Sequence, residues 1–236
     1  MTAASGSGGR EAGSARRDVQ LEVRKTYKLY IGGEFVRTES GRYDPIYRAS
    51  ASRRSAGAAR EPGALLANVS RGSRKDLREA VRKARAAQPG WAAKSAYLKG
   101  QILYRMAEML EGRADSFERV LRETGSAASA ARREVRASID RLVHYAGWSD
   151  KFGALLGTVN PVASSYFDFS VPEATGVVGI VAPEAPDLLG VVSHLAPAVV
   201  AGNAAVVILS ERGPIGALEL AEVLATSDLP GGVANL

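Results

Sequence analysis

The last quarter of the chain alternates buried-strand patterns with apolar helical patterns, and this alternation limits the possible folds most strongly. Gly176–Ala182 (GVVGIVA) and Ala204–Leu209 (AAVVIL) are apolar runs of strand length, and Gly232–Leu236 (GVANL) begins a third. Helical patterns over Asp187–Ala201 and Pro214–Ala225 separate these runs. Buried strands joined by helices form a parallel sheet with right-handed crossovers. The sequence therefore predicts an α/β fold containing part of a Rossmann-like sheet.

The portion before this sheet is predicted to be helical and extended. Tyr27–Val36 (YKLYIGGEFV) alternates apolar and polar residues around a Gly-Gly pair, which is typical of a hairpin. Ser73 and Asp76 stand at capping-box spacing before the first of four amphipathic helices, which Pro89-Gly90 should end. Thr158–Val171 is rich in β-branched and aromatic residues and predicts an extended excursion.

The polar, glycine-rich N-terminus has no apolar central region, so no secretory signal is expected, and a cytoplasmic location is the default. No run of about 18 apolar residues predicts a membrane span.

A sheet that stops at its third strand is expected to leave one edge unpaired, as a docking surface. The predicted parts are a disordered arm (1–24), a hairpin and helical portion (25–152) with a basic loop (48–63), an extended segment (153–172), and a partial dinucleotide-binding βαβαβ unit (173–236).

Composition excludes several kinds of site. The chain contains no cysteine, which rules out disulfides, zinc–thiolate sites and a thiol nucleophile within it. His144 and His194 are far apart, so a histidine metal site is not expected; His194 is interpreted as a core residue and His144 as part of an amphipathic helix. Net charge is +6, yet no aromatic residues interleave with the basic stretch Arg48–Arg85, which makes nucleic-acid binding a weak alternative.

The candidate site follows from topology, because ligands of open α/β sheets bind beyond the carboxyl ends of the strands. These ends are Val181–Asp187 and Ser210–Gly213, and neither carries a glycine-rich phosphate loop. Glu211 could accept hydrogen bonds from ribose hydroxyls, or it could cap or pair with a nearby helix end. Glu184 and Asp187 could form an acid/base pair, although Asp187 is better interpreted as the N-cap of the following helix.

The order of these segments resembles the aldehyde dehydrogenase superfamily over roughly residues 27–236, which match the front part of a family member. The resemblance rests on YKLYIGGEFV, on the helix around Trp91–Leu110, and on two longer motifs. These motifs are GVVGIVAPEAPDLLGVVSHLAPAVVAGNAAVVILSERGP and LAEVLATSDLPGGVANL. The resemblance implies NAD(P)-dependent oxidation of aldehydes to acids. In that reaction a cysteine thiolate attacks the aldehyde, an asparagine and a backbone amide hold the oxyanion, and a glutamate activates water.

Carried over position by position, the resemblance loses several functional residues of the family and retains one that binds the cofactor. The family tryptophan corresponds to Glu184, the oxyanion asparagine to Ala185, and the ribose-binding lysine to Ile208, whereas the ribose-binding glutamate is retained as Glu211. The catalytic cysteine and glutamate would follow Leu236, so the isolated chain is expected to be inactive and to have no catalytic residue. NAD is the implied cofactor, with NAD favoured over NADP. Its predicted contacts are Val181, Ala182, Pro183, Ser210 and Glu211.

Two explanations of these departures remain open. The chain could be a divergent, non-catalytic protein with a structural or regulatory role. Its partner would then be a complete aldehyde dehydrogenase, or a second copy of itself in a homo-oligomer. In the family the region matching 153–172 makes oligomer contacts. Alternatively it could be a truncated fragment whose missing half held the cysteine. Truncation explains the missing cysteine, whereas divergence explains Ala185 and Ile208.

Overall fold

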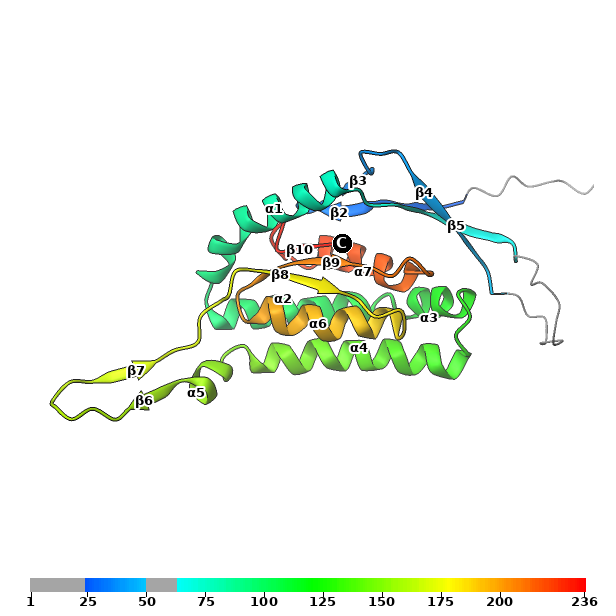
Figure 1. Cartoon of the computed structure of the whole chain (residues 1–236). Helices are drawn as coiled ribbons and strands as arrows, with labels where there is room; N and C mark the ends of the chain where they lie inside the picture. Colours follow the sequence, from blue (N-terminus) through cyan, green and yellow to red (C-terminus); the bar gives the residue numbers. More distant parts are fainter. Residues whose placement is uncertain (1–23, 50–62) are drawn as a thin grey trace, which may run out of the picture.

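A computed structural model describes residues 24–49 and 63–236. Most of the predicted disordered N-terminal segment (1–24) and of the basic loop (48–63) therefore lies outside the described residues. The chain forms a layered α/β body from which a thin two-stranded arm extends (Figure 1). The strands are β1 (Thr26–Tyr27), β2 (Leu29–Ile31), β3 (Glu34–Val36), β4 (Tyr43–Tyr47), β5 (Leu65–Ser70), β6 (Thr158–Asn160), β7 (Asp168–Ser170), β8 (Val177–Val181), β9 (Ala204–Ile208) and β10 (Ala234–Asn235). The helices are α1 (Arg74–Ala92), α2 (Ala96–Glu111), α3 (Ala114–Glu123), α4 (Ala128–Trp148), α5 (Phe152–Leu156), α6 (Asp187–Val200) and α7 (Ile215–Thr226).

The predicted parallel sheet is confirmed, with strand order β10-β9-β8 and both pairings parallel. Helix α1 packs on one face of this sheet, and α6 packs on the opposite face (Figure 1). Alternation along β9 explains this layering. Ala204 and Val206 pack with Ala80 and Ala84 of α1, whereas Ala205 belongs to the cluster of α6 and α7. The strands read as continuous apolar runs because both faces are covered.

Gly202 and Asn203 end α6 and start β9, as the sequence predicts. Gly202 has φ of +88°, the left-handed conformation in which a helix commonly ends at glycine. The Asn203 N–H donates to the carbonyl of Ala198 at 3.1 Å, and its side-chain Nδ2 donates to the same carbonyl at 3.1 Å. Its Oδ1 accepts from the N–H of Gly176 at 2.9 Å, just before β8. One asparagine therefore closes the helix and aligns the two strands.

The edge of β10 is not open, so the expected unpaired edge at the third strand is wrong. Tyr30 of β2 and Leu236 exchange two backbone hydrogen bonds of 2.8 Å each. The buried Asn235 reinforces this junction. Its Oδ1 accepts from Gly32 N–H at 2.8 Å, and its Nδ2 donates to the carbonyls of Ala205 at 3.1 Å and Gly232 at 2.8 Å. At the other end of this parallel sheet, the outer edge of β8 has no partner among the described strands.

The hairpin predicted over Tyr27–Val36 is confirmed as β2 and β3, whose turn is Gly32-Gly33. Gly33 has φ of +89°, and a Cβ there would lie 2.8 Å from the Cα of Gly231. The turn therefore needs glycine both for its conformation and for its close approach to the segment before β10.

A second sheet was missed by the sequence analysis. Strands β1, β5 and β4 form a three-stranded mixed sheet beside the hairpin. Tyr27 in β1 donates its hydroxyl to Glu219 of α7, and Lys25 also pairs with Glu219 at 2.9 Å, so this sheet is attached to the body. Burial alternates along β4, and residues 50–62 separate β4 from its partner β5, so no short hairpin pattern in the sequence joins the two strands.

Helix α1 begins as the sequence predicts but ends later than expected. The predicted capping box is present: the Ser73 side chain accepts from the Asp76 N–H, and the Asp76 carboxylate accepts from the Ser73 N–H. Pro89 does not end α1, which continues to Ala92. Pro89 is exposed, so water can bind the backbone carbonyl one turn earlier that receives no N–H from proline.

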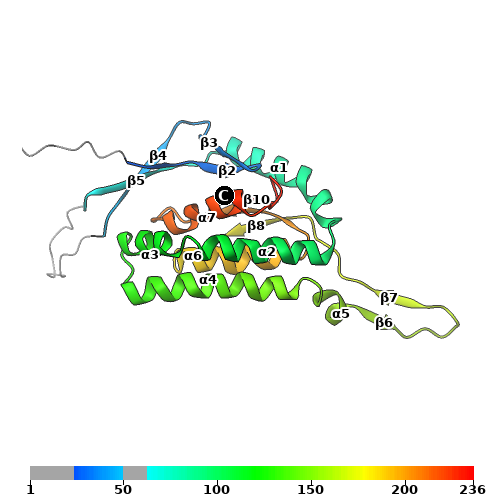
Figure 2. The ribbon, with the colours of Figure 1, turned by 180° about the vertical axis from the view of Figure 1, so that it is seen from behind.

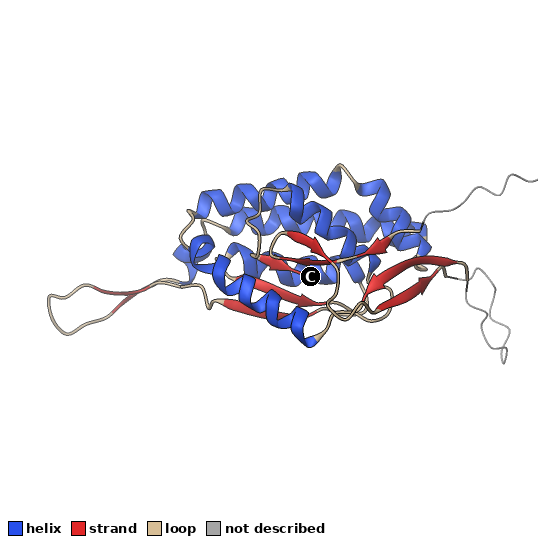
Figure 3. Cartoon of the chain, turned by 90° about the horizontal axis from the view of Figure 1, so that it is seen from above, coloured by secondary structure: helices blue, strands red, loops and turns tan. Residues whose placement is uncertain are grey.

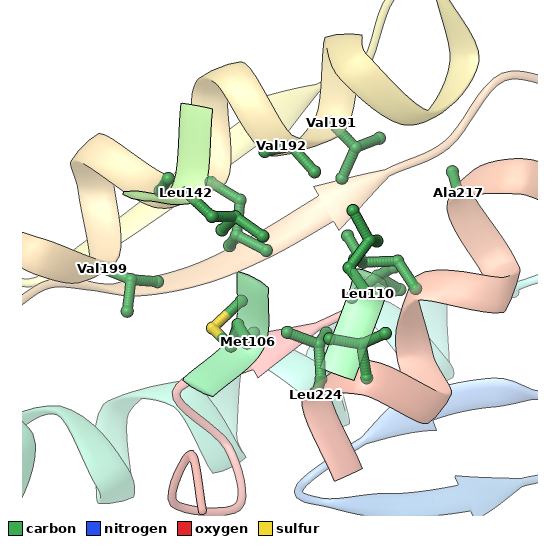
Figure 4. Packing of buried hydrophobic residues seen from close by; sticks show 14 of the residues in the cluster. Met106, Leu110, Leu142, Val191, Val192, Val199, Ala217 and Leu224 are labelled. Carbon is green, nitrogen blue, oxygen red and sulfur yellow. The ribbon is translucent and has the colours of Figure 1, made fainter. Parts of the chain in front are cut away.

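The helices and the parallel sheet share one continuous core. Figure 4 shows side chains from several elements packing against one another there. Those labelled are Met106, Leu110, Leu142, Val191, Val192, Val199, Ala217 and Leu224.

The extended excursion predicted over Thr158–Val171 is a β6–β7 hairpin that projects away from the body in all three views (Figures 1, 2 and 3). We call this hairpin and its tip, residues 158–171, the arm. Its large apolar side chains are exposed, with Tyr166 at 80% and Phe167 at 74%. None of the helices within the described ranges is long and apolar enough to cross a membrane.

The junction at Asn235 yields a stability prediction. Replacing Asn235 with alanine leaves the Gly32 N–H and the carbonyls of Ala205 and Gly232 without this partner, in a position where the side chain is fully buried. We expect the free energy of unfolding to fall by about 2–4 kcal/mol. Urea unfolding measures this loss. Asn160→Ala on the arm is the matched control, because the hydrogen bonds that the Asn160 side-chain amide donates are exposed to solvent. It should lower the free energy of unfolding by less than about 0.5 kcal/mol. Equal effects of the two substitutions would contradict the role of Asn235.

Candidate functional site

The crevice beyond β8 begins with residues that alternate between solvent and core. Val181 is 79% exposed, whereas Ala182 is buried and extends the ladder by donating its N–H to the Ile208 carbonyl at 2.9 Å. Pro183 is partly buried against Gly190 of α6, where the absence of a side chain makes room for its ring. Val181 is the register partner of Ile208 on the neighbouring strand, and Ile208 is 50% exposed, so two exposed apolar side chains lie next to each other at the strand ends.

The loop after β9 presents Glu211 without a partner. The Ser210 hydroxyl accepts from the Arg212 N–H at 3.0 Å, which folds the loop into a tight turn. Glu211 is exposed at the tip of this turn, and no side chain in the described part of the chain forms a hydrogen bond or ion pair with it. The alternative in which Glu211 caps or pairs with a nearby helix end is therefore wrong. Its carboxylate is available to a ligand.

Glu184 and Asp187 have separate partners and do not form the acid/base pair considered from the sequence. Glu184 is exposed and lies 3.7 Å from Arg212, which joins the two loops across the crevice. Ala185, next to it, carries no side-chain donor that could hold an oxyanion.

Asp187 caps a different helix from the one predicted. The N-cap of α6 is Pro186, and Asp187 is the first residue of that helix. Its Oδ2 accepts from the N–H groups of Gly216 at 2.7 Å and Ala217 at 3.2 Å, in the first turn of α7. A Cβ on Gly216 would lie 2.7 Å from this same oxygen. The contact therefore needs both an aspartate at 187 and a glycine at 216.

The N-terminus of α6 is occupied in the same way from α4. Glu134 Oε1 accepts from the N–H groups of Leu188 at 2.8 Å and Leu189 at 3.3 Å. Helix N-termini beside such a crevice commonly bind anions, since their N–H groups are free. Here carboxylates of the chain already take these groups, so α6 and α7 offer no open anion site.

The carboxyl group of Asp187 has an unusual acidity. Burial raises its pKa from 3.8 to about 7, and the negative charge of Glu134 acts in the same direction. The hydrogen bonds from Ala217 and Gly216 oppose this shift, because they favour the charged form. The proton on Asp187 is therefore exchanged near neutral pH, at the junction of α6 and α7.

The two histidines lie outside the site. His194 is exposed, so its interpretation as a core residue is wrong; the buried stripe of α6 contains Val191, Val192 and Leu195 instead. His144 is also exposed, with its ring 5.2 Å from that of Tyr145. Across residues 24–49 and 63–236, no group of three or more His, Asp or Glu side chains could hold a metal ion.

Sequence reasoning missed the roles of Glu134 and Gly216. Glu134 lies in α4, more than fifty residues before the helix that it caps, so no local pattern connects the two. Gly216 did give a signal, because a glycine in the first turn of an apolar helix is disfavoured and suggests a close approach.

The raised pKa of Asp187 gives a pH prediction. The folded protein retains a proton that the unfolded chain releases between pH 3.8 and about 7, so unfolding free energy falls as the pH rises across this range, by a few kcal/mol. Asp187→Asn keeps an oxygen acceptor without the charge and should flatten this slope. Asp187→Ala loses the acceptor and should cost about 1–3 kcal/mol. Urea unfolding at pH 5 and pH 8 measures both, with the exposed Asp140→Asn as control. An unchanged slope in Asp187→Asn would refute the assignment.

Comparison with known proteins agrees with this architecture. The model of the aldehyde dehydrogenase family matches residues 47–236. HpcC from Thermus thermophilus has 27% identity and a TM-score of 0.79, covering 90% of this chain and 39% of its own. A NAD-dependent benzaldehyde dehydrogenase from Corynebacterium glutamicum has 25% identity and a TM-score of 0.78, covering 89% and 43%.

An aldehyde dehydrogenase from Bacillus cereus, solved as its NAD+ complex, has a TM-score of 0.80 over 89% of this chain and 41% of its own; its 24% identity supports the fold alone. The chain thus spans about two fifths of the length of the structures that it matches. Given the family match over most of its length, the chain belongs to the aldehyde dehydrogenase family.

Proposed function

We propose that this chain contributes the ribose-binding part of an NAD site of the aldehyde dehydrogenase type, and that by itself it oxidises no aldehyde. The observation that carries the proposal is the free carboxylate of Glu211 at the end of β9. A carboxylate at this place accepts hydrogen bonds from both ribose hydroxyls and repels a 2′-phosphate, so NAD is preferred over NADP. The family's redox chemistry and the location of the site agree with an oxidoreductase origin.

The residues around the strand ends fit one part of the cofactor. Val181 and Ile208 offer apolar surface beside Glu211, whereas the N-termini of α6 and α7 hold carboxylates and offer no cradle for a pyrophosphate. Ser210 shapes the loop that presents Glu211, and Ala182 and Pro183 fix the path of the chain on the opposite side of the crevice. When bound, NAD supplies the hydride acceptor of the family reaction.

The catalytic part of the family reaction has no counterpart in these residues. The chain contains no cysteine, so it holds no thiolate to attack an aldehyde. Ala185 replaces the side chain that would stabilise the oxyanion, and loss of one such donor costs about 10²–10³ in rate. We therefore propose a non-catalytic, pseudoenzyme role for the isolated chain, in the cytoplasm.

Calorimetric titration of the 236-residue chain with NAD and NADP tests the ribose site. We expect NAD to bind and Glu211→Gln to weaken binding at least about tenfold, because hydrogen bonds to a charged group contribute about 1.5–3 kcal/mol. Glu173→Gln, at an exposed carboxylate before β8, should leave affinity unchanged. Equal affinities of wild type and Glu211→Gln would refute the site. Production of NADH from any aldehyde by the pure chain would refute the non-catalytic role.

The arm favours a second role, as a structural partner of a complete aldehyde dehydrogenase or of a second copy of this chain. Tyr166, Phe167 and Phe169 are 80%, 74% and 56% exposed on a hairpin that makes few contacts with its own body. Exposed apolar patches of this kind mark interaction surfaces. The unpaired edge of β8 adds a place where another strand could pair.

Light scattering tests the role of the arm. We expect the wild type to self-associate or to bind a complete aldehyde dehydrogenase, and we expect Phe167→Asp/Phe169→Asp to remain a 24.8 kDa monomer with an unchanged melting temperature. Tyr97→Ser serves as control, since Tyr97 is 72% exposed on the body rather than on the arm. A wild type that is monomeric and binds no complete enzyme would contradict this role.

A further inference from the structure

A groove runs along the outer side of α2, and its lining includes no residue of the loops that follow β8 and β9. Its volume is about 980 Å³, and it is lined by α2, the last turns of α4, the connection from α1 to α2 and the turn before β10. Figure 2 shows α2 and α4 side by side on the outside of the body. Ligand sites range from about 300 to 1,000 Å³, so the groove is large enough for a small organic molecule.

Small residues form the floor of this groove, where α2 and α4 come into close contact. A Cβ on Gly100 would lie 2.4 Å from Ser149 Oγ and 2.9 Å from the carbonyl oxygen of Ala146. Gly147 lines the groove next to them, and a Cβ there would meet no atom within 4 Å. There is therefore open space above Gly147, at the centre of a floor that has no large side chains.

The hydroxyl of Ser149 is buried at this floor and has no partner in the described part of the chain. Ser149 is the C-cap residue of α4, is 6% exposed and lines the groove. The buried hydroxyls of Ser138 and Ser227, in contrast, donate to backbone carbonyls at 2.8 Å and 3.3 Å. Since buried hydroxyls are nearly always hydrogen-bonded, the exception at Ser149 points to a polar group that enters the groove.

Exposed aromatic side chains form the wall of the groove on α2. Tyr97 and Tyr104 are 72% and 51% exposed, and their spacing of seven residues places them on one side of the helix. Gln101 lies between them and donates to the Tyr97 hydroxyl at 3.1 Å. On α4, Val143 is 41% exposed and also lines the groove. An aromatic ring bound here would remove these apolar surfaces from water and could stack on a tyrosine.

Positive charge gathers at the end of the groove where α2 begins. Lys94 is exposed there and forms no ion pair with any described residue. Lys151 also lines this end, and its 3.1 Å pair with Asp150 is exposed on both sides, so the pair contributes little to stability. Toward the other end, Arg105 is already paired with Asp228 at 3.0 Å. An anionic group is therefore favoured at the end that also holds the unpartnered hydroxyl.

We propose that this groove binds a small aromatic carboxylate. Its ring lies between Tyr97 and Tyr104, above the floor of small residues. Its carboxylate accepts a hydrogen bond from the Ser149 hydroxyl and pairs with the ammonium groups of Lys94 and Lys151. Hydroxyl and ammonium donors bind an ionised oxygen more strongly than a neutral one, so the charge of the ligand matters as well as its ring. This site is independent of the proposed ribose site.

Calorimetry with naphthoate and its uncharged analogue naphthylmethanol separates the contribution of the carboxylate from that of the ring. The wild type should bind naphthoate at least about tenfold more tightly at low salt. Lys94→Gln/Lys151→Gln should remove this difference and leave the affinity for naphthylmethanol unchanged. Ser149→Ala should weaken naphthoate binding about tenfold without lowering the melting temperature, because the hydroxyl has no protein partner to lose.

A substitution that fills the groove tests its position. Gly147→Leu places a side chain in the open space above the floor and should abolish binding of both probes. Leucine has a higher helix propensity than glycine, so the melting temperature should not fall. Gly90→Leu is the matched control: Gly90 is an exposed glycine of α1, a Cβ there also meets no atom within 4 Å, and it does not line the groove. This variant should bind both probes as the wild type does.

Each part of the proposal can be overturned separately. A wild type that binds neither probe, or a Gly147→Leu variant that keeps the wild-type affinities, would refute the site. A double lysine variant that still prefers naphthoate would refute the assigned position of the carboxylate. A Ser149→Ala variant that binds naphthoate as tightly as the wild type, or that only loses stability, would refute the role of the buried hydroxyl.

Discussion

The carboxamide of Asn235 holds together three segments that are distant in the sequence, and the parallel sheet depends on it. It bonds the hairpin turn at Gly32, the strand β9 at Ala205, and the turn before β10 at Gly232. Together with the paired backbone of Tyr30 and Leu236, it covers one edge of the sheet with the chain's own N-terminal strand. The edge of this parallel sheet that has no partner strand among the described residues is therefore that of β8, beside the candidate site.

The helices that follow β8 and β9 are fixed by carboxylates rather than left open to ligands. Glu134 holds the start of α6, and Asp187 at the start of α6 holds the start of α7 through the space left by Gly216. This arrangement orders the crevice and removes the helix N-termini as anion sites. Glu211, on the loop after β9, keeps a free carboxylate. The proposed contact with a ribose therefore rests on this residue.

The sequence predicted those features that depend on local pattern. The strands β8 and β9 follow from apolar runs, and the helix end at Gly202-Asn203 follows from a left-handed glycine. The place of the candidate site follows from the topology of parallel strands and stays a prediction. The partners of Asp187 and Asn235 could not be predicted, because each lies on an element brought close only by folding. His194 was misassigned because a mostly apolar helix hides which of its sides meets solvent.

The most direct test of the central claim, that a ribose-bearing ligand binds at the end of β9, is a map of amide chemical shifts. The ¹⁵N-labelled chain would be titrated with AMP and its amide spectrum followed. We expect the largest changes at Ser210, Glu211 and Arg212, in the turn after β9. Changes confined to other parts of the body, or none at saturating AMP, would contradict it.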